Sequence, residues 1–170
     1  LGPLAPCLPN RLRTADKQID LAPQVFVSDV ERVKTRLFDE VAPASNGHLL
    51  LIGRRQLRSN NSWMHNSERL VKGNSAKPAC TILMHPTDAA NRDLLNGQKV
   101  VVSSSVGSIV LPVELTDEIM PGVVSIPHGW GHDRDGNQQS VAQQHAGASI
   151  NDLTDQQAVD GLCGTAAFNG

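Results

Sequence analysis

The spacing of hydrophobic positions along the chain changes near residue 48. Before that point, apolar residues recur at helical spacing over one short segment, and the remainder is rich in proline and polar residues. After it, apolar residues form runs of strand length, separated by polar and glycine-containing segments. The pattern predicts two parts. Residues 1–44 are a linker or the tail of a preceding domain, with one amphipathic helix, and residues 45–170 are a mainly β domain.

The helix is predicted from Ser28 to about Glu40. Ser28 and Glu31 have the spacing of a capping box, in which a hydroxyl and a carboxylate satisfy free N–H groups at the start of a helix. The apolar residues of the segment fall on one face of such a helix. They are Val30, Val33, Leu37 and Val41.

Five runs in the second part are predicted strands. "HLLLIG" and "CTILMHP" are short apolar runs, "QKVVVSSS" and "SIVLPVEL" flank Val106 and Gly107 as a hairpin, and "VVSIPHG" is the fifth. A helix between the second and third strands is expected to start with Thr87 as its cap and to end at Gly97. The economical arrangement of these strands is a small closed barrel, because closure leaves no exposed edge.

The composition fits a globular domain and disfavours two classes of partner. Hydrophobic residues make up 39% of the chain and charged residues 19%. A net charge of −2 provides no global basic field, which argues against a dedicated nucleic-acid-binding protein. No stretch approaches the roughly 20 apolar residues that span a bilayer, and no signal peptide is visible, so no membrane partner is expected.

The cysteines and the start of the chain give two weaker expectations. Cys7, Cys80 and Cys163 are odd in number and far apart, so they form neither a disulfide framework nor a CxxC metal site. Free thiols favour a reducing compartment, and a cytoplasmic location is therefore expected. Because the chain begins at Leu1 without methionine, it is expected to be part of a longer protein.

Polar side chains crowd residues 54–66, which follow the first predicted strand and are called the polar loop below. Arginine presents a planar fork of donors suited to phosphate. Asparagine offers a donor and an acceptor, which match the mixed edge of a purine or pterin. Such groups at the end of a strand converge on a ligand; the alternative is a solvated surface loop. The candidates are Arg54, Arg55, Arg58, Ser59, Asn60, Asn61, Ser62 and His65.

A second candidate segment is "PHGWGH", residues 127–132, called the glycine loop below. His128 and His132 have the spacing of a helical zinc site, but one proline and two glycines disfavour a helix and no third ligand is apparent. Gly129 instead suggests a backbone that must come close to something flat or bulky. Trp130 either stacks on a ring or covers the core.

A third candidate segment, "SINDLTD", contains Asn151. It is either the start of a helix or a place from which an amide reaches the ligand of the polar loop. No serine lies in a nucleophile elbow, and no cysteine has a neighbour that would activate it. The glycine spacings fit neither a P-loop nor a Rossmann-type dinucleotide fingerprint. The sequence therefore contains no self-contained active site.

Three segments, in order, resemble the C-terminal domain of molybdopterin-dependent oxidoreductases, a superfamily that includes formate dehydrogenases, nitrate reductases and dimethyl sulfoxide reductase. The resemblance covers about residues 45–170. The segments are "LLLIGRRQLRSNNSWMHN", "MHPTDAANRDLLNGQKVVVSSSVGSIVLPVELTDEIMPGVVSIPHGWGH" and "INDLTD…GTAAFNG".

This resemblance implies a six-stranded double-psi β-barrel that holds a bis(molybdopterin guanine dinucleotide) cofactor with molybdenum or tungsten. It also implies upstream domains of the same polypeptide that share the cofactor and supply the metal ligand. By motif match the polar loop contacts the dinucleotide, His128, Gly129, Trp130 and Asn151 form a second group of contacts, and Phe168 belongs to a third. The metal performs the chemistry, so the chain alone is expected to be inactive.

Two other functions compete with a formate dehydrogenase-like cofactor domain. The first is a non-catalytic double-psi barrel that recognises proteins, which would have no reason to concentrate polar residues in these two loops. The second is a small autonomous enzyme on the same barrel, such as a decarboxylase. That enzyme would need its own nucleophile or self-processing serine, and the sequence marks none.

Overall fold

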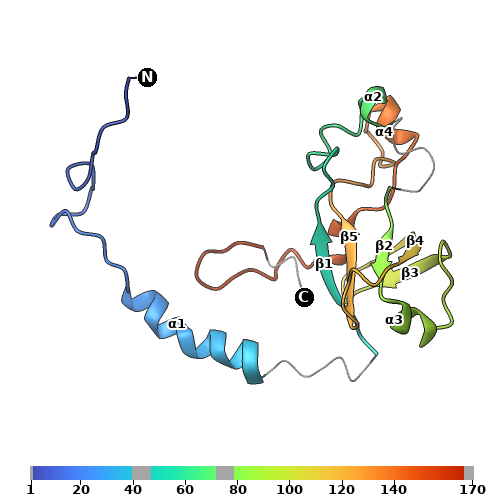
Figure 1. Ribbon diagram of the computed structural model, residues 1–170, viewed down its shortest axis with the longest axis horizontal. Helices are drawn as coiled ribbons and strands as arrows, with labels where there is room; N and C mark the ends of the chain where they lie inside the picture. Colours follow the sequence, from blue (N-terminus) through green and yellow to red (C-terminus); the bar gives the residue numbers. More distant parts are fainter. Residues whose placement is uncertain (1, 40–46, 72–78, 167–170) are drawn as a thin grey trace. The chain divides into compact units, whose positions relative to one another are not determined.

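The computed structural model describes residues 2–39, 47–71 and 79–166 (Figure 1). The chain divides into two compact units, Leu1–Ala42 and Pro43–Gly170. All the strands of the described residues belong to the second unit. Within the described ranges, no helix combines the length and the apolar character needed to cross a bilayer.

The helix of the first unit, α1 (Gln24–Lys34), begins earlier than predicted, and it continues as a π-helix, η1 (Thr35–Asp39). The predicted capping box is wrong, because Ser28 lies inside the helix, where its hydroxyl accepts a 3.0 Å hydrogen bond from the side chain of Gln24. The residue before the helix is Pro23, whose carbonyl accepts the N–H groups of the first turn. Proline has a fixed φ and no N–H to satisfy, so it can start a helix without a side-chain cap.

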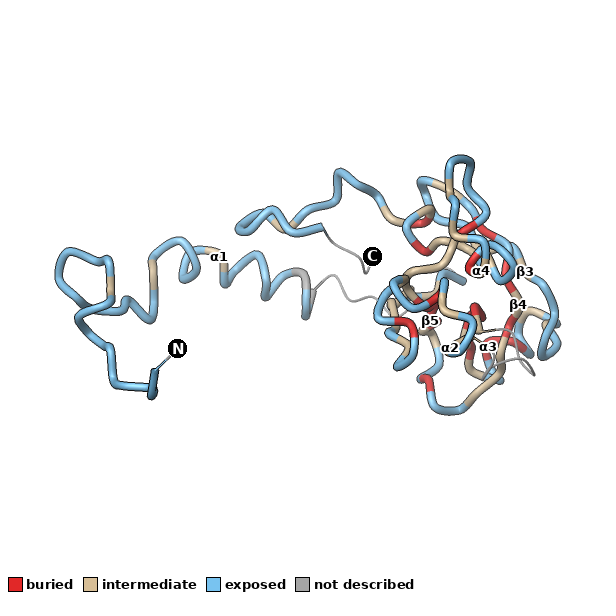
Figure 2. The backbone as a smooth tube through the Cα atoms, turned by 90° about the horizontal axis from the view of Figure 1, so that it is seen from above, coloured by how far each residue is buried: buried red, intermediate tan, exposed pale blue. Residues whose placement is uncertain are grey.

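The predicted apolar face of α1 is exposed in its unit (Figure 2). Val30 is 56% exposed and Val33 is 40% exposed. The predicted end of the helix, Glu40 with Val41, lies outside the described residues.

Five strands form one mixed sheet in the order β1-β5-β2-β4-β3 (Figure 1). Two parallel pairs, β1 with β5 and β2 with β4, flank a central antiparallel pair of β5 with β2. The predicted hairpin is confirmed, because β3 and β4 pair in antiparallel register from either side of the turn. The strands are β1 (Leu50–Arg54), β2 (Ile82–Met84), β3 (Lys99–Ser103), β4 (Ser108–Leu115) and β5 (Val123–Pro127).

The fold is mainly β with short helices, as predicted. In the described residues the sheet is open, with β1 and β3 at its edges. The five-stranded sheet does not show closure into a six-stranded double-psi barrel, so the barrel stays a prediction.

The core lies against the middle strands of the sheet. Residues 109, 111 and 113 of β4 point inward and are buried, whereas Val110 between them is 57% exposed, which is the alternation expected of a strand with one buried face. The inner strand β5, which has a neighbour on each side, is buried over four consecutive residues. The buried cluster comprises Ile82, Met84, Ala89, Ile109, Leu111, Val113, Val124, Ile126, Ile150 and Leu153.

The helix between β2 and β3 is shorter than predicted. It is α3 (Pro86–Ala90), and its cap is His85, whose Nδ1 accepts the N–H of Thr87 at 3.1 Å. The predicted cap at Thr87 is therefore wrong, because Pro86 occupies the first helical position and moves the cap back to the residue before it. Gly97, the predicted end, has a φ of +81° but lies beyond the helix, in the turn before β3.

Candidate functional site

The polar loop leaves β1 through a series of tight turns. Asn60 and Asn61 have φ values of 42° and 63°, a left-handed conformation that asparagine tolerates better than most residues. The next turn is closed by a 3.1 Å bond from the N–H of His65 to the carbonyl of Ser62. These turns bury His65 and Ser59 and leave the two asparagines exposed.

Arg54, at the end of β1, points into the sheet. Its guanidinium donates to the carbonyl of Ser125 on β5, and to the carbonyl and hydroxyl of Thr81 at 2.8 and 2.9 Å. The Thr81 hydroxyl in turn donates to the carboxylate of Glu114 on β4 at 2.7 Å. Burial lowers the pKa of Arg54, and the charge of Glu114 opposes that shift. Arg54 therefore ties strands together, and its contact with a dinucleotide stays a prediction.

The other two arginines of the polar loop are exposed. Burial lowers the pKa of His128, and the positive charge of Arg55 lowers it further, so Arg55 lies close to the glycine loop. Arg58 lines a pocket beside the polar loop. The two guanidiniums are thus available to a ligand that reaches the polar loop.

The glycine loop packs directly on the polar loop and on β1. Gly129 has a φ of +87°, and a Cβ at this position would lie 2.1 Å from the carbonyl oxygen of Asn61. The imidazole of His128 covers Gly53, where a Cβ would lie 2.1 Å from its Nε2. At Gly129 the neighbouring atoms belong to the backbone and only glycine allows the approach, so Gly129 sets how closely the two loops meet.

A buried cluster of rings joins the same two loops. Nδ1 of His65 lies 2.8 Å from Nε2 of His132, and the two rings are perpendicular. The ring of Trp130 lies over His65 with a centroid separation of 4.1 Å. Its Nε1 donates to the side chain of Gln56 at 3.1 Å, and Gln56 donates to the carbonyl of Ala79. Trp130 is thus fixed at both ends.

Both imidazoles of this cluster are 6% exposed. Burial lowers the pKa of His65, and the neighbouring imidazole lowers it further. Burial likewise lowers the pKa of His132, while the carboxylate of Asp133 opposes the shift. Because both pKa values lie below that of an ordinary imidazole, both rings are neutral at pH values above it, and the 2.8 Å contact is then a hydrogen bond in which one nitrogen carries the proton. Nε2 of His65 is buried and has no hydrogen-bond partner in the described structure.

The third candidate segment joins the site through its first residues. A Cβ on Gly131 would lie 2.7 Å from the Cβ of Ser149, and the N–H groups of Gly131 and His132 both donate to the carbonyl of Ala146. Asn151 follows in a short 3-10 helix, η3 (Ile150–Leu153), and is exposed. Of the two interpretations of this segment, a helix start is present, and the contact of Asn151 with a ligand stays a prediction.

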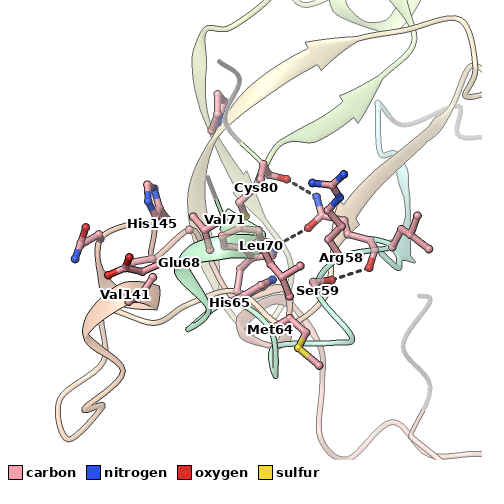
Figure 3. Close-up of a pocket in the computed structure, with 18 of the residues that line it drawn as sticks. Arg58, Ser59, Met64, His65, Glu68, Leu70, Val71, Cys80, Val141 and His145 are labelled. Atoms are coloured by element: carbon pink, nitrogen blue, oxygen red, sulfur yellow. Dashed lines mark hydrogen bonds between the residues drawn. The ribbon is translucent and has the colours of Figure 1, made fainter. Parts of the chain in front are cut away.

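A pocket of about 1080 Å³ lies beside the polar loop (Figure 3). In Figure 3, Arg58 and Ser59 lie on one side of it, Val141 and His145 on the other, and His65 between them. Further walls come from α2 (Glu68–Val71), from residues around α4 (Ser140–Gln143) and from the β3–β4 hairpin.

Some of the predicted site residues line this pocket, and others lie outside it. Ser59 and His65 are buried in the pocket wall, and Trp130 also lines it. Arg55 and Asn60 are exposed outside it. Phe168 lies outside the described residues.

Sequence reasoning overlooks two residues that shape the site, and it pairs a third with the wrong partner. Gln56 fixes Trp130, and Asn66 accepts the N–H groups that begin α4 with its side-chain oxygen, at 3.0 and 3.2 Å. The spacing of His132 pairs it with His128 as a possible zinc ligand, whereas its ring nitrogen contacts His65. Within the described residues, no group of three or more His, Cys, Asp or Glu is placed to hold a metal.

Comparison with known proteins gives consistent matches over the second unit. The family model described as "Molydopterin dinucleotide binding domain" matches residues 49–170. The tetrathionate reductase of Salmonella typhimurium contains a chain that is 28% identical over 127 residues, which cover 69% of this chain and 12% of that one. A dimethyl sulfoxide/trimethylamine N-oxide reductase of Rhodobacter capsulatus is 43% identical over 51 residues, or 30% of this chain and 6% of that protein.

The fold is also found in a solved structure. Acetylene hydratase from Pelobacter acetylenicus superposes with a TM-score of 0.57 at 22% identity, covering 85% of this chain and 18% of the hydratase. The chain thus spans less than a fifth of each of these proteins. The family model matches well over half of the chain, and the two loops that meet here lie within the matched residues. The chain therefore belongs to the molybdopterin dinucleotide-binding domain family of the molybdopterin oxidoreductase superfamily.

Proposed function

We propose that this chain is the cofactor-binding domain of a larger molybdopterin-dependent oxidoreductase and that its two loops hold a bis(molybdopterin guanine dinucleotide) cofactor. The observation that carries the proposal is the meeting of the polar loop and the glycine loop. A contact between residues 67 positions apart joins them, beside a pocket of about 1080 Å³. A rigid junction between loops with exposed cationic and amide groups is the arrangement that a large anionic ligand requires.

The residues present fit the chemistry of such a dinucleotide. The exposed guanidiniums of Arg55 and Arg58 match the pyrophosphate groups, and the exposed amides of Asn60 and Asn61 match the mixed donor and acceptor edges of guanine or pterin. The apolar pocket wall around Trp130 offers a surface for a flat ring. Ser59 and His65 are buried, so they contribute through the shape of the loop.

The finer features of the parent protein are part of this proposal. It resembles formate dehydrogenases in sequence motifs, its metal is molybdenum or tungsten, and it is cytoplasmic. Upstream domains of the same polypeptide share the cofactor and carry the metal ligand. In isolation the chain then binds and does not catalyse, because the metal supplies the redox chemistry and the protein supplies position and charge.

We also propose that the five strands belong to a six-stranded double-psi barrel. Two parallel pairs on either side of an antiparallel central pair support this topology, as does the bridge of Val159 with Ala166 after the last strand. A crystal structure of the full-length protein with only these five strands in the domain would rule the barrel out.

The cofactor content of the full-length protein tests the proposal. We expect the purified protein, once denatured, to release guanine nucleotide together with molybdenum or tungsten. The nucleotide is measured by chromatography and the metal by mass spectrometry. Protein that contains neither would overturn the proposed function, and cytidine nucleotide in place of guanine would overturn the dinucleotide assignment.

Replacement of the exposed arginines should reduce this content without unfolding the domain. A charged hydrogen bond is worth about 1.5–3 kcal/mol, so Arg55→Ala or Arg58→Ala should each weaken dinucleotide binding about 10- to 100-fold. The measurement is guanine released per protein, with circular dichroism as the check on folding. Arg13→Ala, which removes an exposed arginine from the first unit, is the matched control and should leave the content unchanged.

A further inference from the structure

We propose that His65 and His132 form a latch that holds the polar loop against the glycine loop, and that both are positioning residues for the ligand-binding face. The effect of the latch on ligand binding rests on the proposed function, since the two latched loops are those assigned to the dinucleotide. It assigns His65 a different role from a direct ligand contact. It also gives His132, which the sequence suggests only as part of the glycine loop or as a zinc ligand, a defined role in the site.

The geometry of the pair carries the inference. The 2.8 Å contact from Nδ1 of His65 to Nε2 of His132 is a side-chain hydrogen bond between the two loops. Further contacts hold both residues in place. The ring of Trp130 lies over that of His65, and the backbone of His132 is hydrogen-bonded to Ala146 and to the side chain of Asn137. Breaking the contact while the rings stay buried would leave two ring nitrogens without partners, and this penalty opposes any small loosening of the two loops.

The latch fixes the distance between groups on the two loops that would contact the ligand. On the same two loops, the backbone of Gly129 passes within contact distance of the backbone of Asn61, and only glycine permits this approach. The exposed amide of Asn61 and the exposed guanidinium of Arg55 therefore stand at a spacing that the buried rings maintain. Contacts to a rigid ligand lose affinity when their supports loosen by as little as about 1 Å.

The latch has a defined protonation requirement. The hydrogen bond needs one nitrogen without a proton. Burial disfavours an imidazolium at either position, and the backbone of Gly129 opposes this shift without reversing it. In the open loops both histidines would titrate near their ordinary pKa, about 6.5. The closed form has the lower pKa, so it takes up fewer protons, and the latch weakens as the pH falls below about 6.5.

Other ionisable groups near the pair do not change this direction. Asp133 follows His132 in sequence, and the remaining groups line the same pocket as His65. Five of them are exposed, whereas both imidazoles are buried, so burial decides the protonation state. These five are Arg58, Glu68, Lys99, Asp133 and His145. The sixth, Cys80, is buried, and burial raises the pKa of its thiol, which therefore adds no charge beside the rings.

The first test is made on the ligand-free chain, so it is independent of the proposed function. Amide hydrogen exchange of residues 59–65 and 128–132 is measured at about pH 7.5 in the wild type, in His132→Leu and in His132→Gln. The leucine removes the ring nitrogen at similar volume, whereas the glutamine places an amide where Nε2 was. We expect His132→Leu to speed exchange in both loops about tenfold, and His132→Gln to restore slow exchange. Unchanged exchange in the leucine variant, or no rescue by glutamine, would overturn the latch.

The pH dependence of tryptophan fluorescence tests the protonation requirement, which a pair with only a packing role would not have. In a Trp63→Phe background, Trp130 is the single tryptophan, and its fluorescence reports the protonation of the imidazole it covers. We expect a transition below about pH 6.5 that disappears in the double variant His65→Asn with His132→Gln, which keeps hydrogen-bonding groups but cannot titrate. A flat wild-type profile between about pH 8 and 5 would contradict the proposal. Circular dichroism confirms that each variant is folded.

The third readout is affinity for guanosine diphosphate, a probe with the guanine and pyrophosphate of the dinucleotide. His132→Leu should weaken its binding about tenfold, and His132→Gln should restore it to within about twofold. Faster exchange with unchanged affinity would overturn the positioning role. If the wild type itself does not bind the probe, the proposed function loses support, and the exchange and pH measurements alone decide whether the latch exists.

Discussion

Gly129→Ala should separate the two loops and abolish cofactor binding. Gly129 has a φ of +87°, and the added methyl group would lie 2.1 Å from the carbonyl oxygen of Asn61, an atom of the backbone that cannot rotate away. The expected loss in the free energy of unfolding is about 3 kcal/mol or more, from left-handed strain plus displacement of the polar loop. Urea denaturation of the ligand-free chain measures this loss, and the guanine content of the full-length protein measures the effect on binding.

Gly136→Ala is the matched control for this substitution. Gly136 has nearly the same φ, +84°, but a Cβ there would have no atom within 4 Å. It should therefore incur the conformational strain alone, about 1–2 kcal/mol, and leave cofactor content intact. The difference between the two variants isolates the approach of the loops. Equal losses would show that the contact with Asn61 has no energetic role.

The strands could be predicted from the sequence because their signals are local. Alternation in β4 and the short apolar runs of β1, β2 and β5 reflect which face of each residue is buried, and neighbouring residues suffice to detect them. The starts of the helices were harder to predict. Ser28 and Thr87 both match capping preferences, but Pro23 and Pro86 are closer to the true starts, and a proline fixes the backbone more strongly than a hydroxyl does.

The inner arrangement of the polar loop could not be predicted, because its partners are distant in sequence. Arg54 and Arg55 are adjacent and chemically alike, yet one is tied into the sheet and the other is exposed. What separates them is the alternation of side chains at the end of β1 and the presence of Thr81 on the inner side. The pairing of His65 with His132 likewise depends on how β1 and β5 lie side by side. The glycines were the one visible signal, since they require a close approach without naming the partner.

Arg54→Ala should destabilise the domain more than any other single change in the polar loop. It removes a guanidinium that donates to three acceptors from two separate segments, Ser125 of β5 and Thr81 before β2. It also leaves the carboxylate of Glu114 facing the sheet without the neighbouring positive charge. We expect a loss of about 3 kcal/mol in the free energy of unfolding of the ligand-free chain, measured by urea denaturation. Arg55→Ala, at the exposed neighbouring position, should stay within about 0.5 kcal/mol of the wild type.

The Arg54→Ala variant also decides whether Arg54 acts on the cofactor directly or by holding the sheet together. If its role is to tie strands together, Arg54→Lys should recover only part of the stability, because an ammonium group cannot present the planar fork that meets Ser125 and Thr81 together. The guanine content of the Arg54→Ala protein should then fall in proportion to its unfolded fraction and recover under stabilising conditions. In Arg58→Ala, by contrast, the guanine content should stay low although the domain is folded. A stable Arg54→Ala variant that lacks guanine nucleotide would instead establish the direct contact that the sequence motif predicts, and it would require the guanidinium to leave the sheet when the ligand binds.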